Sequence, residues 1–123
     1  ELEKAGKLRA VITQNIDGLH QAAGSKNVLE LHGSIMRNYC MDCRAFASIE
    51  DMLAAREASL ADGGDGVPRC PKCGGILKPD VVLYDEMLDQ KVLERSVEAL
   101  MQASLLIIAG TSLVVNPAAS LVR

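Results

Sequence analysis

The chain has 123 residues, of which 49% are apolar, so it is large and apolar enough to form one domain and unlike a disordered protein in composition. Its formal net charge is -3 and only 2% of its residues are aromatic, which disfavours a basic or base-stacking surface for nucleic acid. The apolar run 103–115 is interrupted by polar residues and is shorter than the roughly 20 residues that span a bilayer, so we expect no membrane anchor.

The N-terminal third alternates short apolar runs with polar turns. Residues 8–13 form a β-rich run that enters a polar loop. Asp17 is placed to cap a short helix, and Gly24 is placed to end it in the left-handed conformation. A second apolar run, 28–31, ends at a turn that carries His32. Each of these strands is therefore predicted to deliver polar side chains to a turn.

The middle of the chain predicts one helix between turn-rich segments. Residues 48–60 have helical spacing of apolar positions and begin with a capping box. The glycine and aspartate run 62–66 that follows predicts a flexible surface loop. Short strands are then expected at 76–78 and 81–84, on either side of Pro79.

The last third predicts a helix followed by a buried strand. Asp89 is placed to cap an amphipathic helix whose apolar positions run from 92 to 101. The unbroken apolar run 105–109 is typical of a central parallel strand that is covered on both faces. The pair Asn116-Pro117 then opens a helix that has little room before Arg123. Because the chain stops inside an element and lacks an initiator Met, we interpret it as a piece of a longer protein.

Alternating strands and amphipathic helices indicate the fold class α/β, with part of a Rossmann-like parallel sheet. The polar clusters after the predicted strands lie at their carboxyl ends, where such sheets bind ligands. The cysteine-bearing segment differs in texture and is interpreted as an inserted zinc-ribbon module. We therefore expect a discontinuous dinucleotide-binding domain at 1–38 and 80–123, and a small zinc-binding domain at 39–79.

The strongest motif is a pair of Cys-x-x-Cys turns separated by 26 residues. The four cysteines are Cys40, Cys43, Cys70 and Cys73. Two such turns supply the four sulfurs of the tetrahedral site that zinc prefers. Two redox-active dithiols or incidental buried thiols are the alternatives, although a thioredoxin-type motif would open a helix, whereas Cys73 runs into Gly74-Gly75.

Four thiolates leave no open position for a water molecule, so we expect one structural zinc ion that takes no part in catalysis. No export signal is visible, and cysteines act as metal ligands in a reducing compartment. The predicted location is therefore the cytoplasm.

The candidate catalytic residues lie in the polar turns. His32 is the best acid/base candidate because imidazole titrates near neutral pH, although a hydrogen-bonding turn histidine is the alternative. His20 is interpreted as structural or solvated. The cluster 14–17 has ordinary turn formers as its alternative, and 110–112 is a weak candidate for binding phosphate or ribose.

Taken together, the motifs closely resemble those of sirtuins, the NAD-dependent protein deacylases. They are Thr13-Gln14-Asn15-Ile16-Asp17-Gly18-Leu19-His20, Glu30-Leu31-His32-Gly33-Ser34, the paired Cys-x-x-Cys turns, Lys78-Pro79-Asp80-Val81-Val82-Leu83-Tyr84 and Gly110-Thr111-Ser112-Leu113-Val114-Val115. They occur in the order found in that family and span most of the chain.

The resemblance implies that an acyl group passes from a modified lysine to ADP-ribose as nicotinamide leaves. It implies that His32 is the general base and that Asn15 has a catalytic role beside it. The implied contacts to NAD are Gln14, Asn15, Ile16, Asp17, Gly110, Thr111 and Ser112. The implied partner is an acyl-lysine protein or peptide, which would add as a strand between two segments of the chain. The residues that would contact it are Val81, Val82, Tyr84, Leu113, Val114 and Val115, with an aromatic core position as the alternative for Tyr84.

The chain departs from the family pattern at both ends. The family's Gly-Ala-Gly phosphate-binding loop is not found before the first motif, and the later adenosine-binding strands are not found after the last one. We therefore expect weak or no NAD affinity and no turnover from this polypeptide alone. The alternative functions are a noncatalytic zinc-ribbon interaction module and a protein ADP-ribosyltransferase.

Overall fold

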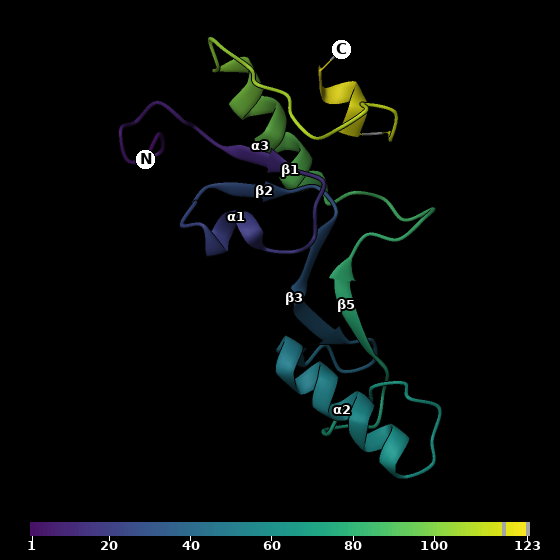
Figure 1. Cartoon of the computed structure of the whole chain (residues 1–123). Helices are drawn as coiled ribbons and strands as arrows, with labels where there is room; N and C mark the ends of the chain where they lie inside the picture. The colour runs from purple at the N-terminus through teal and green to yellow at the C-terminus, as the bar shows by residue number, and fades with distance from the viewer. Residues whose placement is uncertain (117, 123) are drawn as a thin grey trace. The chain divides into compact units, whose positions relative to one another are not determined.

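The computed structural model describes residues 1–116 and 118–122, and it divides into two compact units (Figure 1). One unit consists of Glu1–His32 and Val82–Arg123, and the other is Gly33–Val81. The first unit holds a parallel pair of strands, and the second holds an antiparallel sheet. None of the helices in the described residues combines the length and the apolar character that a membrane crossing needs.

The parallel pair in the first unit joins β1 (Val11–Thr13) to β2 (Val28–Glu30). Between them lies α1 (Leu19–Ala22), with Gly18 as its N-cap and Gly24 at φ 93° just beyond its end. The predicted left-handed stop at Gly24 is confirmed. The two strands therefore end side by side, and the polar loop after β1 lies near the residues that follow β2.

The helix α3 (Gln90–Met101) packs on β2. Its N-cap is Asp89, whose carboxylate accepts hydrogen bonds from the backbone N–H groups of Lys91 and Val92. Ser96 is completely buried on this helix, and its hydroxyl donates to the carbonyl of Val92 at 2.8 Å. The predicted cap and amphipathic helix are confirmed.

The predicted central strand at 105–109 is wrong for this chain. These residues are not in a strand, and Leu105 and Ile107 are 75% and 77% exposed. A parallel strand covered on both faces needs a hydrogen-bonded neighbour and packed layers. Within the described residues β1 pairs only with β2. The run 105–109 therefore has the apolar composition of a strand but no hydrogen-bonded partner strand.

The C-terminal residues form one turn of tighter helix, η1 (Ala118–Val122). The expected N-cap and N1 pair falls partly outside the described residues, because Pro117 is not among them. The backbone N–H of Ala119 donates to the carbonyl of Val115 at 2.9 Å.

The second unit is a three-stranded antiparallel sheet with one helix. Its strands are β3 (Gly33–Cys40), β4 (Phe46–Ala47) and β5 (Leu77–Val81), in the order β4-β3-β5. The helix α2 (Ile49–Ala61) starts with the predicted capping box, in which the backbones and side chains of Ser48 and Asp51 exchange hydrogen bonds. The sheet places both cysteine turns at the same end of the unit.

The two strands predicted on either side of Pro79 are a single strand, β5, that runs through the proline. Pro79 has no N–H group to donate. Because β5 is an edge strand, this missing donor does not interrupt the hydrogen bonds of a central strand. The partner strand β3 shifts its register between Ser34 and Asn38, opposite this region. Beyond β5, Val82 to Tyr84 are not in a strand, which corrects the expected extent of 81–84.

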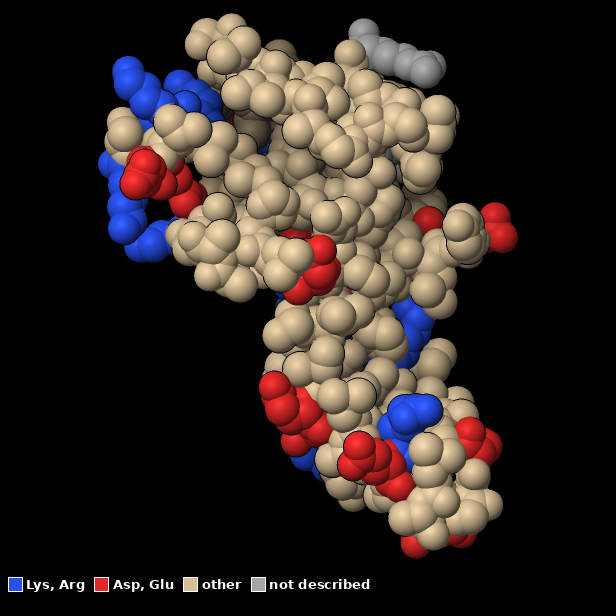
Figure 2. Space-filling view, viewed as in Figure 1, with Lys and Arg blue, Asp and Glu red and all other residues tan. Residues whose placement is uncertain are grey.

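On the face seen in Figure 2, basic and acidic side chains are interspersed. This distribution agrees with the small formal net charge of -3. The charged side chains on this face therefore do not produce an electrostatic field of a single sign.

Candidate metal centre and ligand cavity

Two tight turns hold the four cysteines of the second unit. In the first turn, the N–H of Arg44 donates to the carbonyl of Cys40 at 3.1 Å, and Arg44 adopts a left-handed φ of 59°. In the second turn, the N–H of Gly74 donates to the carbonyl of Cys70 at 2.8 Å, with φ 77° at Gly74. Each turn folds the chain back within four residues, so both of its sulfurs face the same point.

The sulfur positions fit a single tetrahedral metal ion. The Sγ atoms of Cys40 and Cys73 lie 3.4 Å apart, and those of Cys43 and Cys70 lie 3.7 Å apart. All four sulfurs lie within 4.8 Å of one another, and all four cysteines are free. A tetrahedron with zinc–sulfur bonds of about 2.3 Å has sulfur–sulfur edges of about 3.8 Å. The donor set and its spacing therefore suit zinc, and four sulfurs would close its coordination sphere.

Without a bound metal, the thiols of Cys40 and Cys73 differ in pKa. The backbone N–H of Cys43 stabilises the thiolate of Cys40 and is the main cause that lowers the pKa of Cys40 to about 7. At Cys73 the N–H of Gly75 also lowers the pKa, but hydrogen bonds among the neighbouring thiols and burial outweigh it and raise the pKa to about 12. A metal ion must therefore displace a proton from Cys73 at every physiological pH.

The cysteines also form much of the core of their unit. Cys40 and Cys70 are 0% and 3% exposed, and they pack with Ala47 and Leu77. This buried cluster contains few large apolar side chains. A bound metal would therefore supply cross-linking that so small a core lacks.

His32 lies directly against the loop that follows β1. Its Nδ1 is 3.0 Å from the carbonyl oxygen of Gln14. Since a carbonyl oxygen only accepts, Nδ1 must carry the proton of the neutral ring, and Nε2 is left with a free lone pair. The ring is positioned by backbone hydrogen bonds from Leu31 to Thr13 and from Val82 to the carbonyl of His32, at 2.9 Å and 3.0 Å. The arrangement suits a general base that acts through Nε2.

The loop after β1 is shaped by its own polar side chains. The N–H of Asn15 donates to Oγ1 of Thr13, and the N–H of Leu19 donates to Oδ1 of Asp17, both at 3.0 Å. The side chain of Asp17 thus accepts a hydrogen bond from the first residue of α1, although the N-cap is Gly18 and not Asp17 as predicted. The side-chain amides of Gln14 and Asn15 have no hydrogen-bond partner in the part of the chain that the structure describes. Both amides are therefore available to a ligand.

A cavity of about 490 Å³ lies beside β1 in the first unit. This volume is within the range of roughly 300 to 1,000 Å³ that small-molecule sites occupy. The predicted site residues that line it are Gln14, Asn15, Gly110, Thr111 and Leu113. The other predicted contacts of this unit do not line it: Ile16, Asp17, His32, Val82, Tyr84, Ser112, Val114 and Val115. The cavity thus joins the loop after β1 to the Gly-Thr segment after the apolar run.

Sequence reasoning missed the one ionisable side chain among the described residues that line this cavity. His20, which was expected to be structural or solvated, lines it together with Gln14 and Asn15. Its place on α1, one turn after the polar loop, was the signal that could have drawn attention to it.

The sequence model of the Sir2 family matches residues 1–117. The chain belongs to the Sir2 family. It is 57% identical over all 123 residues to the NAD-dependent protein deacetylase of Clostridium perfringens (strain 13 / Type A), and it covers 47% of that protein. It is 44% identical over 121 residues to the NAD-dependent protein deacetylase of Thermotoga maritima, again covering 47%. The chain therefore spans about half the length of the curated relatives that it matches.

Solved Sir2 structures have the same fold over nearly the whole chain. A Sir2 complex with a p53 peptide and NAD+ gives a TM-score of 0.86 at 43% identity, covering 98% of this chain and 48% of the other. A Sir2 bound to an acetylated peptide gives 0.88 at 42% identity, with the same coverage. The predicted fold class is confirmed: an α/β member of the Sir2 family with part of a Rossmann-like parallel sheet and a four-cysteine module.

Apart from Val81, which ends β5, the residues expected to hold an acyl-lysine peptide are not in strands here. Leu113 has a left-handed φ of 55°, and residues 113–115 are not in a strand. Tyr84 is 100% exposed at a turn, so its alternative interpretation as an aromatic core residue is wrong. A strand needs a partner: Val81 has one in Gly33, but residues 82–84 and 113–115 are in no strand pair among the described residues. The assignment of these residues to peptide binding remains a prediction.

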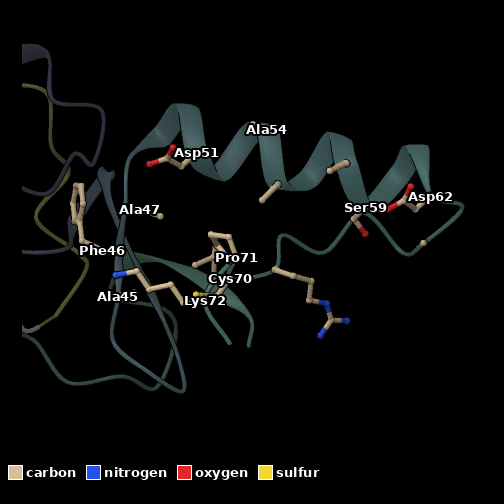
Figure 3. A pocket seen from close by; sticks show the side chains of 15 residues that line it. Ala45, Phe46, Ala47, Asp51, Ala54, Ser59, Asp62, Cys70, Pro71 and Lys72 are labelled. Carbon is tan, nitrogen blue, oxygen red and sulfur yellow. The ribbon is translucent and has the colours of Figure 1, made fainter. Parts of the chain in front are cut away.

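The second unit has a separate, more apolar cleft of about 720 Å³ between α2 and the second cysteine turn (Figure 3). Alanines form much of its lining, and Asp51 and Asp62 lie on the helix side, whereas Lys72 lies on the turn side. Cys70 is the one predicted site residue among those that line it. Since that sulfur belongs to the metal centre, the cleft contains none of the residues predicted to bind NAD or the acyl-lysine.

Proposed function

We propose that this chain is the part of an NAD-dependent protein deacylase that carries the general base, the loop for the nicotinamide end of NAD and the zinc module. The contact between His32 and the backbone of Gln14 carries the proposal, because a histidine suited to act as a base lies beside a loop whose side-chain amides line a cavity. The relatives that match the whole chain and are named NAD-dependent protein deacetylases support it. The substrate class proposed is an acyl-lysine protein or peptide.

NAD, when bound, supplies the ribose that accepts the acyl group as nicotinamide leaves. The amides of Gln14 and Asn15 would hold its nicotinamide and ribose end, and Thr111, which also lines the cavity, would offer a hydroxyl. His32 would remove a proton from a ribose hydroxyl through Nε2, while its Nδ1 proton stays on the carbonyl of Gln14. That hydrogen bond holds the ring in the tautomer that the reaction needs.

The remaining predicted contacts complete the proposal. Ile16, Asp17, Gly110 and Ser112 would hold the dinucleotide, and Val81, Val82, Tyr84, Leu113, Val114 and Val115 would contact the acyl-lysine peptide. One zinc ion on the four cysteines would stabilise the module of residues 39–79 and leave residues 1–38 and 80–123 to bind NAD. A cytoplasmic location is proposed, because zinc ligation needs the four thiols reduced.

A segment exchange tests the proposed function. The 123 residues of this chain would replace the matching half of the Clostridium perfringens relative, to which they are 57% identical. The hybrid should release nicotinamide from NAD when an acetyl-lysine peptide is present, and it should form O-acetyl-ADP-ribose. In the hybrid, His32→Ala should abolish the formation of O-acetyl-ADP-ribose, since the ribose hydroxyl would lose the base proposed for it, whereas the exposed Glu57→Ala should retain it.

The results that contradict the proposal are equally distinct. A folded, zinc-loaded hybrid that releases no nicotinamide would refute the deacylase assignment for this chain. ADP-ribose attached to protein without any need for acetyl-lysine would favour transfer to a protein acceptor instead. Full activity of the His32→Ala hybrid would remove His32 from the role of base.

A further inference from the structure

The cavity beside β1 has one ionisable side chain on its wall. Among the described residues that line it, His20 is the one with an ionisable side chain, and none is Lys, Arg, Asp or Glu. The remaining lining is apolar, or it carries a neutral amide, a hydroxyl or glycine. The charge of the wall therefore depends on whether this imidazole holds a proton.

The imidazole of His20 is held in place but is not used by the fold. The short helix α1 is anchored at its start by Asp17 and on its outer side by Gln21, whose Nε2 donates to Glu30 of β2 at 2.7 Å. The His20 ring itself is half-buried and has no hydrogen-bond or ion-pair partner within residues 1–116 and 118–122. A half-buried imidazole with both nitrogens free is suited to contact a ligand.

The charged groups near α1 are already engaged. Asp17 accepts the hydrogen bond from Leu19, and Glu30 accepts the one from Gln21. His32, the other histidine, has its Nδ1 on the carbonyl of Gln14. None of these groups lines the cavity, so none offsets a positive charge on His20 there.

We propose that His20 is a further ligand-contacting residue, whose neutral imidazole hydrogen-bonds to the nicotinamide-ribose end of NAD+ and whose protonated form repels the positively charged nicotinamide ring. The inference rests on the proposed function, which assigns Gln14 and Asn15 of the same cavity to that end of NAD. Free nicotinamide has a neutral ring, so its binding does not suffer this repulsion. Protonation of His20 at low pH thereby weakens the binding of NAD+ relative to the binding of nicotinamide.

Two small probes distinguish the effect of the ring's charge on binding from the effect of its shape. Nicotinamide is neutral, whereas 1-methylnicotinamide carries the cationic ring of NAD+. The chain contains just two histidines, so its imidazole NMR signals can be assigned with His20→Gln and His32→Gln. Both probes are added to the zinc-loaded 123-residue chain at about pH 8 and at about pH 6, because acidification favours the protonated form of an imidazole.

We expect both probes to shift the His20 signal at the higher pH. At the lower pH, binding of 1-methylnicotinamide should weaken by about tenfold, as like charges a few ångströms apart imply, and nicotinamide should bind nearly unchanged. His20→Gln should remove this pH difference between the probes. Ala22→Gln, an exposed substitution on the same helix, should preserve it.

A His20 signal that neither probe moves, whether or not the amides of Gln14 and Asn15 respond, would overturn the inference. Equal binding of both probes at both pH values would overturn the charge effect. If His20→Gln does not fold, the response of the His20 imidazole signal to the two probes in the unsubstituted chain still tests the inference. An inactive hybrid would instead indicate that the proposed function has failed, so the two failures are distinguishable.

Discussion

At the scale of single residues, the backbone next to His32 depends on a glycine. Gly33 has φ 76°, and a Cβ at this position would overlap the carbonyl oxygen of Asp80 on β5. Gly33→Ala therefore combines left-handed strain with a clash between backbones, which cannot move apart without breaking the pairing of Gly33 with Val81.

We expect Gly33→Ala to lower the free energy of unfolding of its unit by about 3 kcal/mol or more. The control is Gly63→Ala, because Gly63 has φ 72° and nothing within 4 Å of an added Cβ. It carries the strain alone, at about 1 kcal/mol. Denaturant melts of the zinc-loaded proteins would measure both, and equal losses would show that the clash has no effect.

The cysteine protons make metal binding depend on pH. Cys73, with its pKa raised to about 12, must lose a proton to zinc at any neutral pH, whereas Cys40, with its pKa lowered to about 7, must do so only below that value. Zinc affinity should therefore fall on acidification and fall more steeply below about pH 7. Competition with a chromophoric chelator at several pH values would measure it, and a constant affinity would contradict the unequal thiols.

At the scale of elements, local signals were read correctly where they act locally. The carboxylate of Asp89, the capping box at Ser48 and the left-handed Gly24 each stabilise a boundary through neighbours in sequence, so the pattern alone predicts them. The motif predicts His32 and Gln14 as site residues, but the hydrogen bond between them depends on how β1 pairs with β2. His20 was missed because cavity walls come from distant segments.

The predicted strand at 105–109 fails for a nonlocal reason. Its composition is that of a buried strand, but burial depends on partners that its own residues do not encode. At Pro79 the sequence predicts a break between two strands where the structure has one continuous strand, because the edge position of β5 tolerates a proline.

Two matched leucines test this contrast. Leu29 on β2 is 3% exposed, whereas Leu105 is 75% exposed. Leu29→Ala should lower the free energy of unfolding by about 2 to 5 kcal/mol, and Leu105→Ala should change it by about 0.5 kcal/mol or less. Thermal or urea unfolding of this chain would measure the pair. Similar losses at both positions would show that the 105–109 run is buried after all.

At the scale of the whole molecule, the two units differ in what stabilises them. The first unit has the buried leucines Leu29, on the strand that contacts α3, and Leu31, whereas the buried cluster of the second consists of Cys40, Cys70 and two small or medium side chains. With such a core, the second unit should need its metal to stay folded, as small zinc modules do. The first unit has no such requirement.

Removal of zinc by a chelator should therefore unfold Gly33–Val81 selectively. Amide hydrogen exchange would report it residue by residue. The N–H of Leu77, bonded to Pro68 in the second unit, should lose protection, whereas that of Leu31, bonded to Thr13 in the first, should keep most of it. Re-addition of zinc is the control and should restore the protection of Leu77. Simultaneous loss at both amides would show that the units unfold as one, and loss at neither would show that the cysteine cluster is not what stabilises the second unit.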